Sequence, residues 1–382
     1  MPVQQYLRMI ENASVAQRCH ATAALAHIYL HSELDNDERC ATEAVLTLLL
    51  DDSSPKVRLA LAEAFSTSVR APAHIVASLA RDQIEISTYM LGRSVLLSDS
   101  DLIDCVVSGC GEAQRVIAGR ARVSPTVCAA IIEVGETDAI LELLANTQAK
   151  IMPVSYRRLL ERSGHIAEVR ALLVDHESLP ADCRHSLAVK TAEALCQMNI
   201  VQALMGGRRA ERMTHDACVK ASIGLVAATP IEEYPALVEH LQLRGDITTA
   251  FVIRVVAKGQ IDFFGAILVA LSGYKHSRVR GLLIDGRPNV LGALFSAAGL
   301  AESTHASLCT AVQAWRDIIN GKRKLGLHDV ARAMIEQIAR VEAYAGAVPA
   351  AANDDLLSLL NGIHRDAIRE NARRSMLSIA AA

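Results

Sequence analysis

The feature that most constrains the fold is a two-part helical pattern that repeats between residues 51 and 190. Each unit has a short amphipathic segment, a break and a second such segment; in the first unit, Pro55 and Pro72 open the two segments, as proline does in a first helical turn. Equivalent apolar positions return every 25 to 29 residues, at Ala62, Leu91, Ala118, Leu144 and Leu173 for the first segment and at Leu79, Val107, Ile132 and Leu160 for the second. A helical hairpin this short cannot bury its apolar face alone, so the units must stack on one another. The repeat predicts an α-solenoid of short helical hairpins.

The second half of the chain has a related periodicity, which its glycines mark. Five of them recur at steps of 13 or 14 residues, at Gly245, Gly259, Gly273, Gly286 and Gly299. Between them lie apolar segments long enough for one short helix each, such as DITTAFVIRVVAK, for which Asp246 is a suitable N-cap. Glycine just past a helix end readily adopts the left-handed conformation. The pattern therefore predicts further short helices to about residue 320.

The flanking segments depart from the repeat. The first 50 residues contain the longer apolar segments VAQRCHATAALAHIYLH and DERCATEAVLTLLL, which predict N-terminal capping helices. The run MGGRRAER at 205–212 predicts a loop between the two halves. After Trp315 and the turn NGKRKLG we expect a helix to about residue 344, a linker at 346–353 and a last helix at 354–377. The expected parts are capping helices (1–50), hairpin repeats (51–205), a second repeat segment (206–320) and a C-terminal helical extension with its tail (321–382).

Composition supports an all-α fold and excludes several classes of protein. Hydrophobic residues make up 51% of the chain but aromatic residues only 3%, which suits closely packed helices better than aromatic-rich β-sheets. Lys and Arg number 39 against 42 Asp and Glu, a balance that argues against a nucleic-acid-binding protein.

The same composition bears on the compartment. The most apolar stretch, 251–271, is interrupted by Arg254, Lys258 and Asp262, so we expect no membrane insertion. The N-terminus lacks a signal-peptide pattern, and the nine cysteines are scattered without a C-x-x-C pair. Both observations indicate reduced thiols and a cytoplasmic location.

Two blocks of sequence resemble a known bacterial family. The repeat series from LLLDDSSPKVRLALAEAF to LLVDHESLPADCRHSL, and the block LRGDITTAFVIRVVAKGQIDFFGAILVALSGYKHSRVRGLLIDG, are similar to the domain of unknown function 2336 family over roughly residues 44–320. The resemblance implies HEAT-like helical repeats in a bacterial protein and no established activity. It assigns no catalytic residue.

No motif in the chain predicts catalysis or cofactor binding. Phosphate-binding glycine loops and the G-x-S-x-G hydrolase motif are absent from the sequence. His20, His27 and His31 share a helix face, and the last two have a zinc-compatible spacing, but no H-E-x-x-H arrangement accompanies them. Trp315 lies at a helical core spacing in AVQAWRDII. We therefore expect a non-enzymatic protein with no metal and no cofactor.

Clustered basic residues are the remaining candidates for a binding site. Arginine forks bind carboxylates and phosphates in bidentate fashion. The clusters comprise Arg208, Arg209 and Arg212; Lys275, His276, Arg278 and Arg280; Lys322, Arg323 and Lys324; and Arg365, Arg369, Arg373 and Arg374. We select Arg208, Arg209, Arg212, Arg278 and Arg280 as candidate residues for an anion or a partner.

Two functions agree with these features. The first is a protein–protein interaction scaffold or adaptor, because stacked hairpins form an extended groove. The alternative is a regulatory sensor that binds an anionic small molecule or nucleotide between the two halves. A HEAT-like nucleic-acid enzyme is a third hypothesis, against which the net charge weighs.

Overall fold

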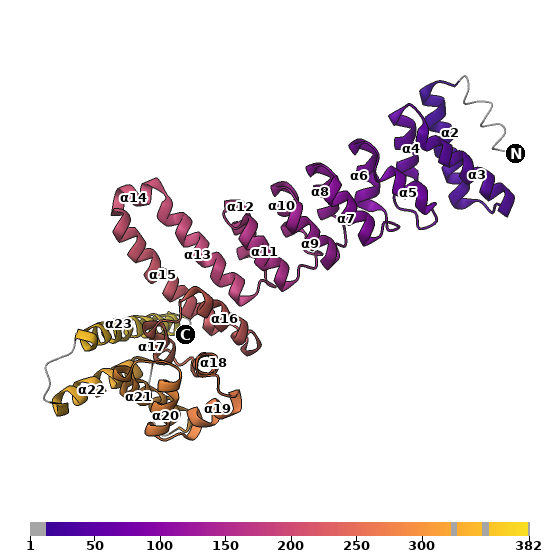
Figure 1. The fold of residues 1–382 in the computed structure, drawn as a ribbon. Coiled ribbons are helices and arrows are strands. Elements are labelled where there is room, and N and C mark those ends of the chain that lie inside the picture. Colours follow the sequence, from indigo (N-terminus) through magenta and orange to yellow (C-terminus); the bar gives the residue numbers. More distant parts are fainter. Residues whose placement is uncertain (1–12, 322–326, 346–350, 381–382) are drawn as a thin grey trace. The chain divides into compact units, whose positions relative to one another are not determined.

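The computed structural model describes residues 13–321, 327–345 and 351–380. In these ranges the chain consists of α-helices and two short 3-10 helices, with no β-strand and one isolated bridge between Val123 and Ala149. The predicted all-α class is therefore confirmed. The helices form two compact units that divide between Leu179 and Pro180 (Figure 1).

The first unit opens with two longer helices in the segment for which capping helices were expected. These are α2 (Val15–His31) and α3 (Asn36–Leu48), which a 3-10 turn at Leu49–Asp51 follows. Shorter helices then succeed one another as α4 (Pro55–Phe65), α5 (Ala73–Leu79), α6 (Ile84–Arg93), α7 (Asp99–Ser108), α8 (Gly111–Ala118), α9 (Pro125–Val134), α10 (Thr137–Ala145), α11 (Pro153–Ser163) and α12 (Ala167–Val174).

Helices of this unit pack on those two places away in the sequence. Helix α4 packs on α6, α6 on α8, α8 on α10 and α10 on α12, while α7 packs on α9 and α9 on α11 (Figure 1). The apolar positions of each helix, such as Leu61, Leu91, Ile117 and Leu143, are buried between the rows. This is the hairpin stacking that the repeat predicts. Helix α2 packs on α4 and so covers the start of the first row.

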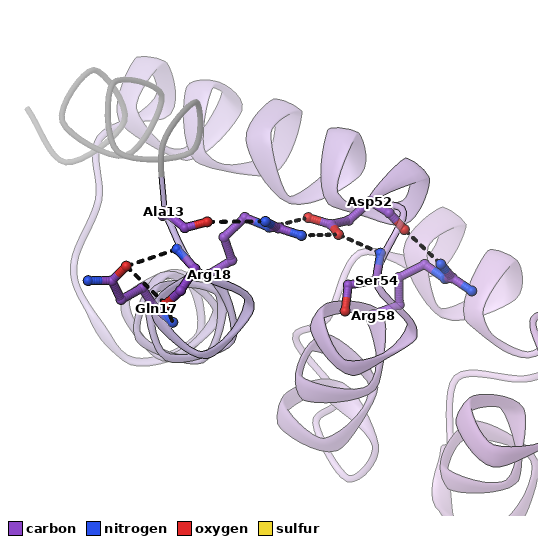
Figure 2. Close-up of polar contacts among 7 residues, drawn as sticks. Ala13, Gln17, Arg18, Asp52, Ser54 and Arg58 are labelled. Atoms are coloured by element: carbon purple, nitrogen blue, oxygen red, sulfur yellow. Dashed lines mark hydrogen bonds and ion pairs between the residues drawn. The ribbon is translucent and has the colours of Figure 1, made fainter.

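Bidentate arginine–aspartate pairs hold the first helices of this row together. Arg18 on α2 donates from Nε and Nη2 to the two carboxylate oxygens of Asp52, at 3.0 and 3.1 Å (Figure 2). Arg58 on α4 pairs in the same way with Asp82, at 2.6 and 3.0 Å, and its Nη1 also donates to the main-chain oxygen of Asp52. All four side chains are at most 17% exposed. A buried charge left unpaired is costly, so these pairs fix the spacing of α2, α4 and α6.

Farther along the stack, polar side chains cap the ends of preceding helices. Arg120 donates to the carbonyl oxygens of Leu91 and Ser94 at the end of α6, and Arg162 donates to that of Ile132 near the end of α9. The last carbonyls of a helix have no partner within it. These bonds therefore satisfy orphan acceptors and join consecutive repeats.

The second unit contains the remaining helices. Their bounds are α13 (Ala181–Gln197), α14 (Asn199–Met205), α15 (Gly207–Ala228), α16 (Tyr234–Arg244), α17 (Thr249–Ala257), α18 (Ile261–Ser272), α19 (His276–Asp285), α20 (Pro288–Ala297), α21 (Glu302–Ile319), α22 (Leu327–Ala345) and α23 (Ala351–Ala380), with a 3-10 turn at Ile231–Glu233.

Helix α17 lies at the centre of this unit. All residues from Phe251 to Ala257 are buried except Arg254, which is partly buried. A helix that is apolar all round must be covered on every side. Helices α15, α18, α21, α22 and α23 all contact it, so the C-terminal helices share one core with the segment before them.

The glycine rhythm is confirmed in most places. Gly245, Gly259, Gly273 and Gly299 have φ between 70° and 81° and follow helix ends, as expected for left-handed caps. Gly286 is an exception, because its φ of −62° is extended backbone. The expected N-cap Asp246 is also wrong: the side chain of Thr248 accepts from the Phe251 N–H and caps α17.

The expected loop at 205–212 is wrong. Helix α14 ends at Met205 and α15 begins at Gly207, so only Gly206, with φ of 74°, leaves the helical conformation. One left-handed glycine is enough to reverse the chain, and the arginines that follow continue as helix. The expected boundary between 205 and 206 therefore falls inside the second unit. The linker expected at 346–353 lies outside the described residues up to 350, and α23 begins at Ala351, three residues before the predicted start at 354.

Candidate functional site

The first predicted arginine cluster lies on the opening turns of α15. Arg208, Arg209 and Arg212 are all exposed, and the Nε of Arg212 donates to the main-chain oxygen of Arg208 at 3.3 Å. Among the described residues none of the three has an ion pair with an acid. Their guanidinium groups are therefore available to an outside anion.

The second predicted cluster lies on α19. Arg278 and Arg280 are exposed, and the guanidinium carbon of Arg278 lies 4.4 Å from the centre of the Tyr274 ring. This cation–π contact holds one of the two arginines against the surface. Both clusters belong to the second unit, but α15 and α19 are not among the helix pairs that pack closely. The structure does not bring them into one site.

Exposed apolar side chains gather immediately before the first cluster. Five large hydrophobic residues between 195 and 205 are at least 40% exposed, and we call them the hairpin tip: Leu195, Met198, Ile200, Leu204 and Met205. Helix α14 has no buried residue and packs mainly on α13 and α15 (Figure 1). Single exposed apolar residues are ordinary, whereas several close together are a candidate interaction surface.

The second unit contains a groove. It has a volume of about 1430 Å³ and lies among α15, α17, α23 and the start of α21. Its walls are aliphatic in part, and they include Ile223, Ala227, Ile253, Ala257, Leu356, Leu359 and Ile363. No aromatic side chain is among the described residues that line it. We call it the α23 groove.

Arg254 is the charged residue that reaches this groove from the buried helix α17. Its Nε is buried and has no hydrogen-bond partner among the described residues. A buried guanidinium N–H normally has an acceptor, because an unmade hydrogen bond is costly in a low-dielectric surrounding. In the sequence, Arg254 indicates only that the apolar stretch 251–271 is interrupted by charge. The signal that could have singled it out is its place as the one charge in TAFVIRVVA.

Further charges line the same groove. Lys220 on α15 pairs with Asp366 on α23 at 3.0 Å, with both side chains more than 40% exposed. Lys258, Arg369 and Arg373 also line it, with no ion pair among the described residues. Arg365 lines it too, and its Nε donates to a main-chain oxygen one turn earlier. The acids in the lining are Asp216, Asp355, Asp366 and Glu370.

The arginine stripe predicted on the last helix thus meets the groove. Arg365, Arg369 and Arg373 line it, whereas the side chain of Arg374 lies outside the described part of the chain. None of the five arginines selected from the sequence lines it. The basic turn at 322–324 falls outside the described residues.

The histidines predicted to share a helix face lie on α2. His20, His27 and His31 are exposed on α2, and the rings of the last two lie 4.5 Å apart. Within the described residues no group of three or more His, Cys, Asp or Glu is placed to hold a metal ion.

A buried histidine pair joins α13 to α16. The Nδ1 of His185 lies 3.3 Å from the Nε2 of His240, and His185 is 3% exposed. Burial, with the nearby His240, lowers the pKa of His185 to about 4. His185 is therefore neutral at pH 7, and in its hydrogen bond with His240 one ring donates and the other accepts.

No described helix is both long enough and apolar enough to cross a bilayer.

Comparison with known proteins gives a family and no function. No curated protein and no solved structure matches the chain significantly. Residues 86–346 match the family described as "Uncharacterised protein conserved in bacteria (DUF2336)". This match spans most of the helical stack and of the second unit, up to the end of α22. The chain belongs to the domain of unknown function 2336 family.

Proposed function

We propose that the protein is a non-enzymatic interaction module that binds a partner protein through the hairpin tip and the adjoining arginines. The observation that carries this proposal is the exposure of apolar side chains on α14, where Ile200 is 64% and Leu204 79% exposed. Water contact with these side chains is unfavourable, and covering them supplies a driving force for association.

The geometry of α14 favours a partner protein with an apolar groove that receives this helix. Ile200 and Leu204 are four residues apart, so they lie one above the other on the same helix face. Anchors with this spacing are typical of a helix that packs into an apolar groove. The tip can therefore present a compact pair of anchors.

The arginines beside the tip add charge selectivity. Arg208, Arg209 and Arg212 follow the apolar stretch directly and carry no acidic partner among the described residues. A complementary surface would combine apolar contacts with carboxylates, which steer association and fix register. We therefore propose an acidic partner protein, and the free thiols of the chain suit a cytoplasmic setting.

The test is affinity capture from an extract of the native bacterium, quantified against two variants. Ile200→Glu with Leu204→Glu disrupts the apolar anchors, and Arg208→Ala with Arg209→Ala and Arg212→Ala removes the charges. The matched control is Val95→Glu with Val107→Glu, which alters two residues of the first unit that are 63% and 64% exposed.

An acidic protein that is retained by the wild type and the control, lost with both tip variants and rebound in purified form supports the proposal. A set of captured proteins that neither tip variant changes would overturn it.

A further inference from the structure

The α23 groove has features of a ligand site that the proposed function does not use. It shares no residue with the hairpin tip or with Arg208, Arg209 and Arg212, so the two proposals can fail independently. Its volume of about 1430 Å³ is larger than the roughly 300–1,000 Å³ of an ordinary small-molecule pocket, and solvent reaches its interior.

Arg254 lines the groove and has one unsatisfied donor. Its Nε is buried without a partner among the described residues, and the residues on either side of Arg254 in α17 are buried. The side chain as a whole is only partly buried, so the groove is lined by a guanidinium group with donors to offer. An anion in the groove would accept charge-assisted hydrogen bonds from it.

The charge balance of the groove agrees with this requirement. Lys220 is the cation whose acid partner, Asp366, lies in the same lining. Arg254, Lys258, Arg369 and Arg373 have no ion pair among the described residues. With Arg365 the lining holds six cations against four acids, so the groove keeps a net positive charge that attracts an anion.

The walls indicate the rest of the ligand. Aliphatic side chains from α15, α17 and α23, such as Ile223, Ala257 and Leu359, line the groove, and no described lining residue is aromatic. A nucleobase is commonly held by stacking on an aromatic ring, which this lining does not offer. An aliphatic chain needs only apolar contact.

Two helical glycines lie beside open space in the groove. A Cβ at Gly224 on α15 or at Gly362 on α23 would meet no heavy atom within 4 Å, and both residues line the groove. Glycine within a helix is less favourable than alanine. At these two positions it leaves free space beside Arg254's helix.

We propose that the α23 groove binds an anionic amphiphile, with a carboxylate or phosphate head on Arg254 and an aliphatic chain along the apolar walls. The guanidinium fork supplies the head-group contact, and Lys258 and the arginines of α23 raise the local concentration of anions.

The experiment measures binding of decanoate and decyl phosphate to the full chain by isothermal titration calorimetry. Decanol, which lacks the charge, and inorganic phosphate, which lacks the chain, are the control ligands. Tighter binding of one amphiphile than of the other distinguishes a carboxylate from a phosphate head.

Three variants locate the site. Arg254→Met removes the charge at similar length and is expected to weaken binding of both amphiphiles at least tenfold. Gly224→Phe narrows the groove beside Arg254 without altering Arg254 and is expected to weaken binding at least tenfold. Arg280→Met is the matched control on α19, with wild-type affinity expected.

Thermal unfolding keeps the test interpretable. Arg254→Met is expected to melt no lower than the wild type, because it removes an unsatisfied buried donor; if it fails to fold, the result with Gly224→Phe decides. The proposal is overturned if neither amphiphile binds the wild type, if decanol or phosphate binds as tightly as the amphiphiles, or if Gly224→Phe binds like the wild type.

Discussion

The indole ring of Trp315 lies directly over Gly259, and its Nε1 donates to the carbonyl oxygen of Val256 at 2.8 Å. A Cβ at position 259 would lie 2.8 Å from Cη2 of that ring. Gly259 also has a φ of 81°, which only glycine adopts without strain. The end of α17 and helix α21 are thus joined at a point where any side chain on residue 259 would clash.

Replacing Gly259 by Ala should destabilise the second unit through both effects. The left-handed conformation costs an alanine roughly 1–2 kcal/mol, and overpacking against the indole adds a further 1–3 kcal/mol or so. Urea denaturation followed by circular dichroism measures the sum. Gly245→Ala is the control, because Gly245 has a φ of 75° but open space around its Cβ position. Equal losses for the two variants would show that the Trp315 contact carries no weight.

The Arg18–Asp52 pair should contribute far more to stability than an exposed pair of the same geometry. Asp52→Ala leaves Arg18 largely buried without its bidentate partner, which typically costs about 3–5 kcal/mol. Glu133→Ala removes the partner of Arg158, also bidentate but with both side chains about half exposed, and should cost less than about 1 kcal/mol. Denaturant titration of the two variants compares them, and a loss for Glu133→Ala as large as for Asp52→Ala would contradict the assignment.

The helical stack of the first unit was predictable because its signals are local. The apolar spacing around Ala62 and Leu91, the prolines that open α4 and α9, and the glycines that close helices all act within a few residues. Helix α2 spans Val15–His31, which is the segment expected from its apolar pattern. Local preferences and tertiary packing agree in this unit, so the sequence pattern was sufficient.

The α23 groove could not be predicted in the same way. Its walls come from α15, α17 and α23, and residues such as Ile253 and Ile363 lie far apart in the sequence. The amphipathic pattern of α23 indicates that one face is covered, but not that α17 lies beneath it. The surroundings of Arg254 therefore could not be predicted from the sequence, because they depend on how α15 and α23 pack against α17.

The arginines of α15 should be dispensable for folding. Arg208→Ala, Arg209→Ala and Arg212→Ala together should change the free energy of unfolding by no more than about 0.5 kcal/mol per residue, because all three are exposed and have no acid partner among the described residues. Differential scanning calorimetry checks this expectation. A large fall in Tm would instead assign them a structural role.

Arg316 is the matched arginine for that experiment. Its three guanidinium nitrogens donate to carbonyl oxygens at the end of α19, at 2.7 to 2.8 Å. Arg316→Ala should lower stability by roughly 2 kcal/mol or more, since it removes charge-assisted bonds and leaves partly buried acceptors unpaired. Indistinguishable Tm values for Arg316→Ala and the wild type would contradict this.

Stability should fall in acid because of the His185–His240 pair. The pKa of His185 is about 4 in the folded chain, against about 6.5 when unfolded, and burial is the main cause, followed by His240; Arg244 lowers it further and Asp246 opposes the shift. Between these two pKa values the unfolded chain binds a proton on His185 and the folded chain does not. The free energy of unfolding therefore decreases as the pH falls from about 6.5 to 4, and the contribution of His185 to stability is fully present above pH 6.5. The difference between the two pKa values corresponds to about 3 kcal/mol at most.

His185→Gln should flatten the pH dependence of the free energy of unfolding in this window, while His20→Gln, at an exposed site on α2, should leave it unchanged. A slope that His185→Gln leaves intact would place the acid sensitivity elsewhere.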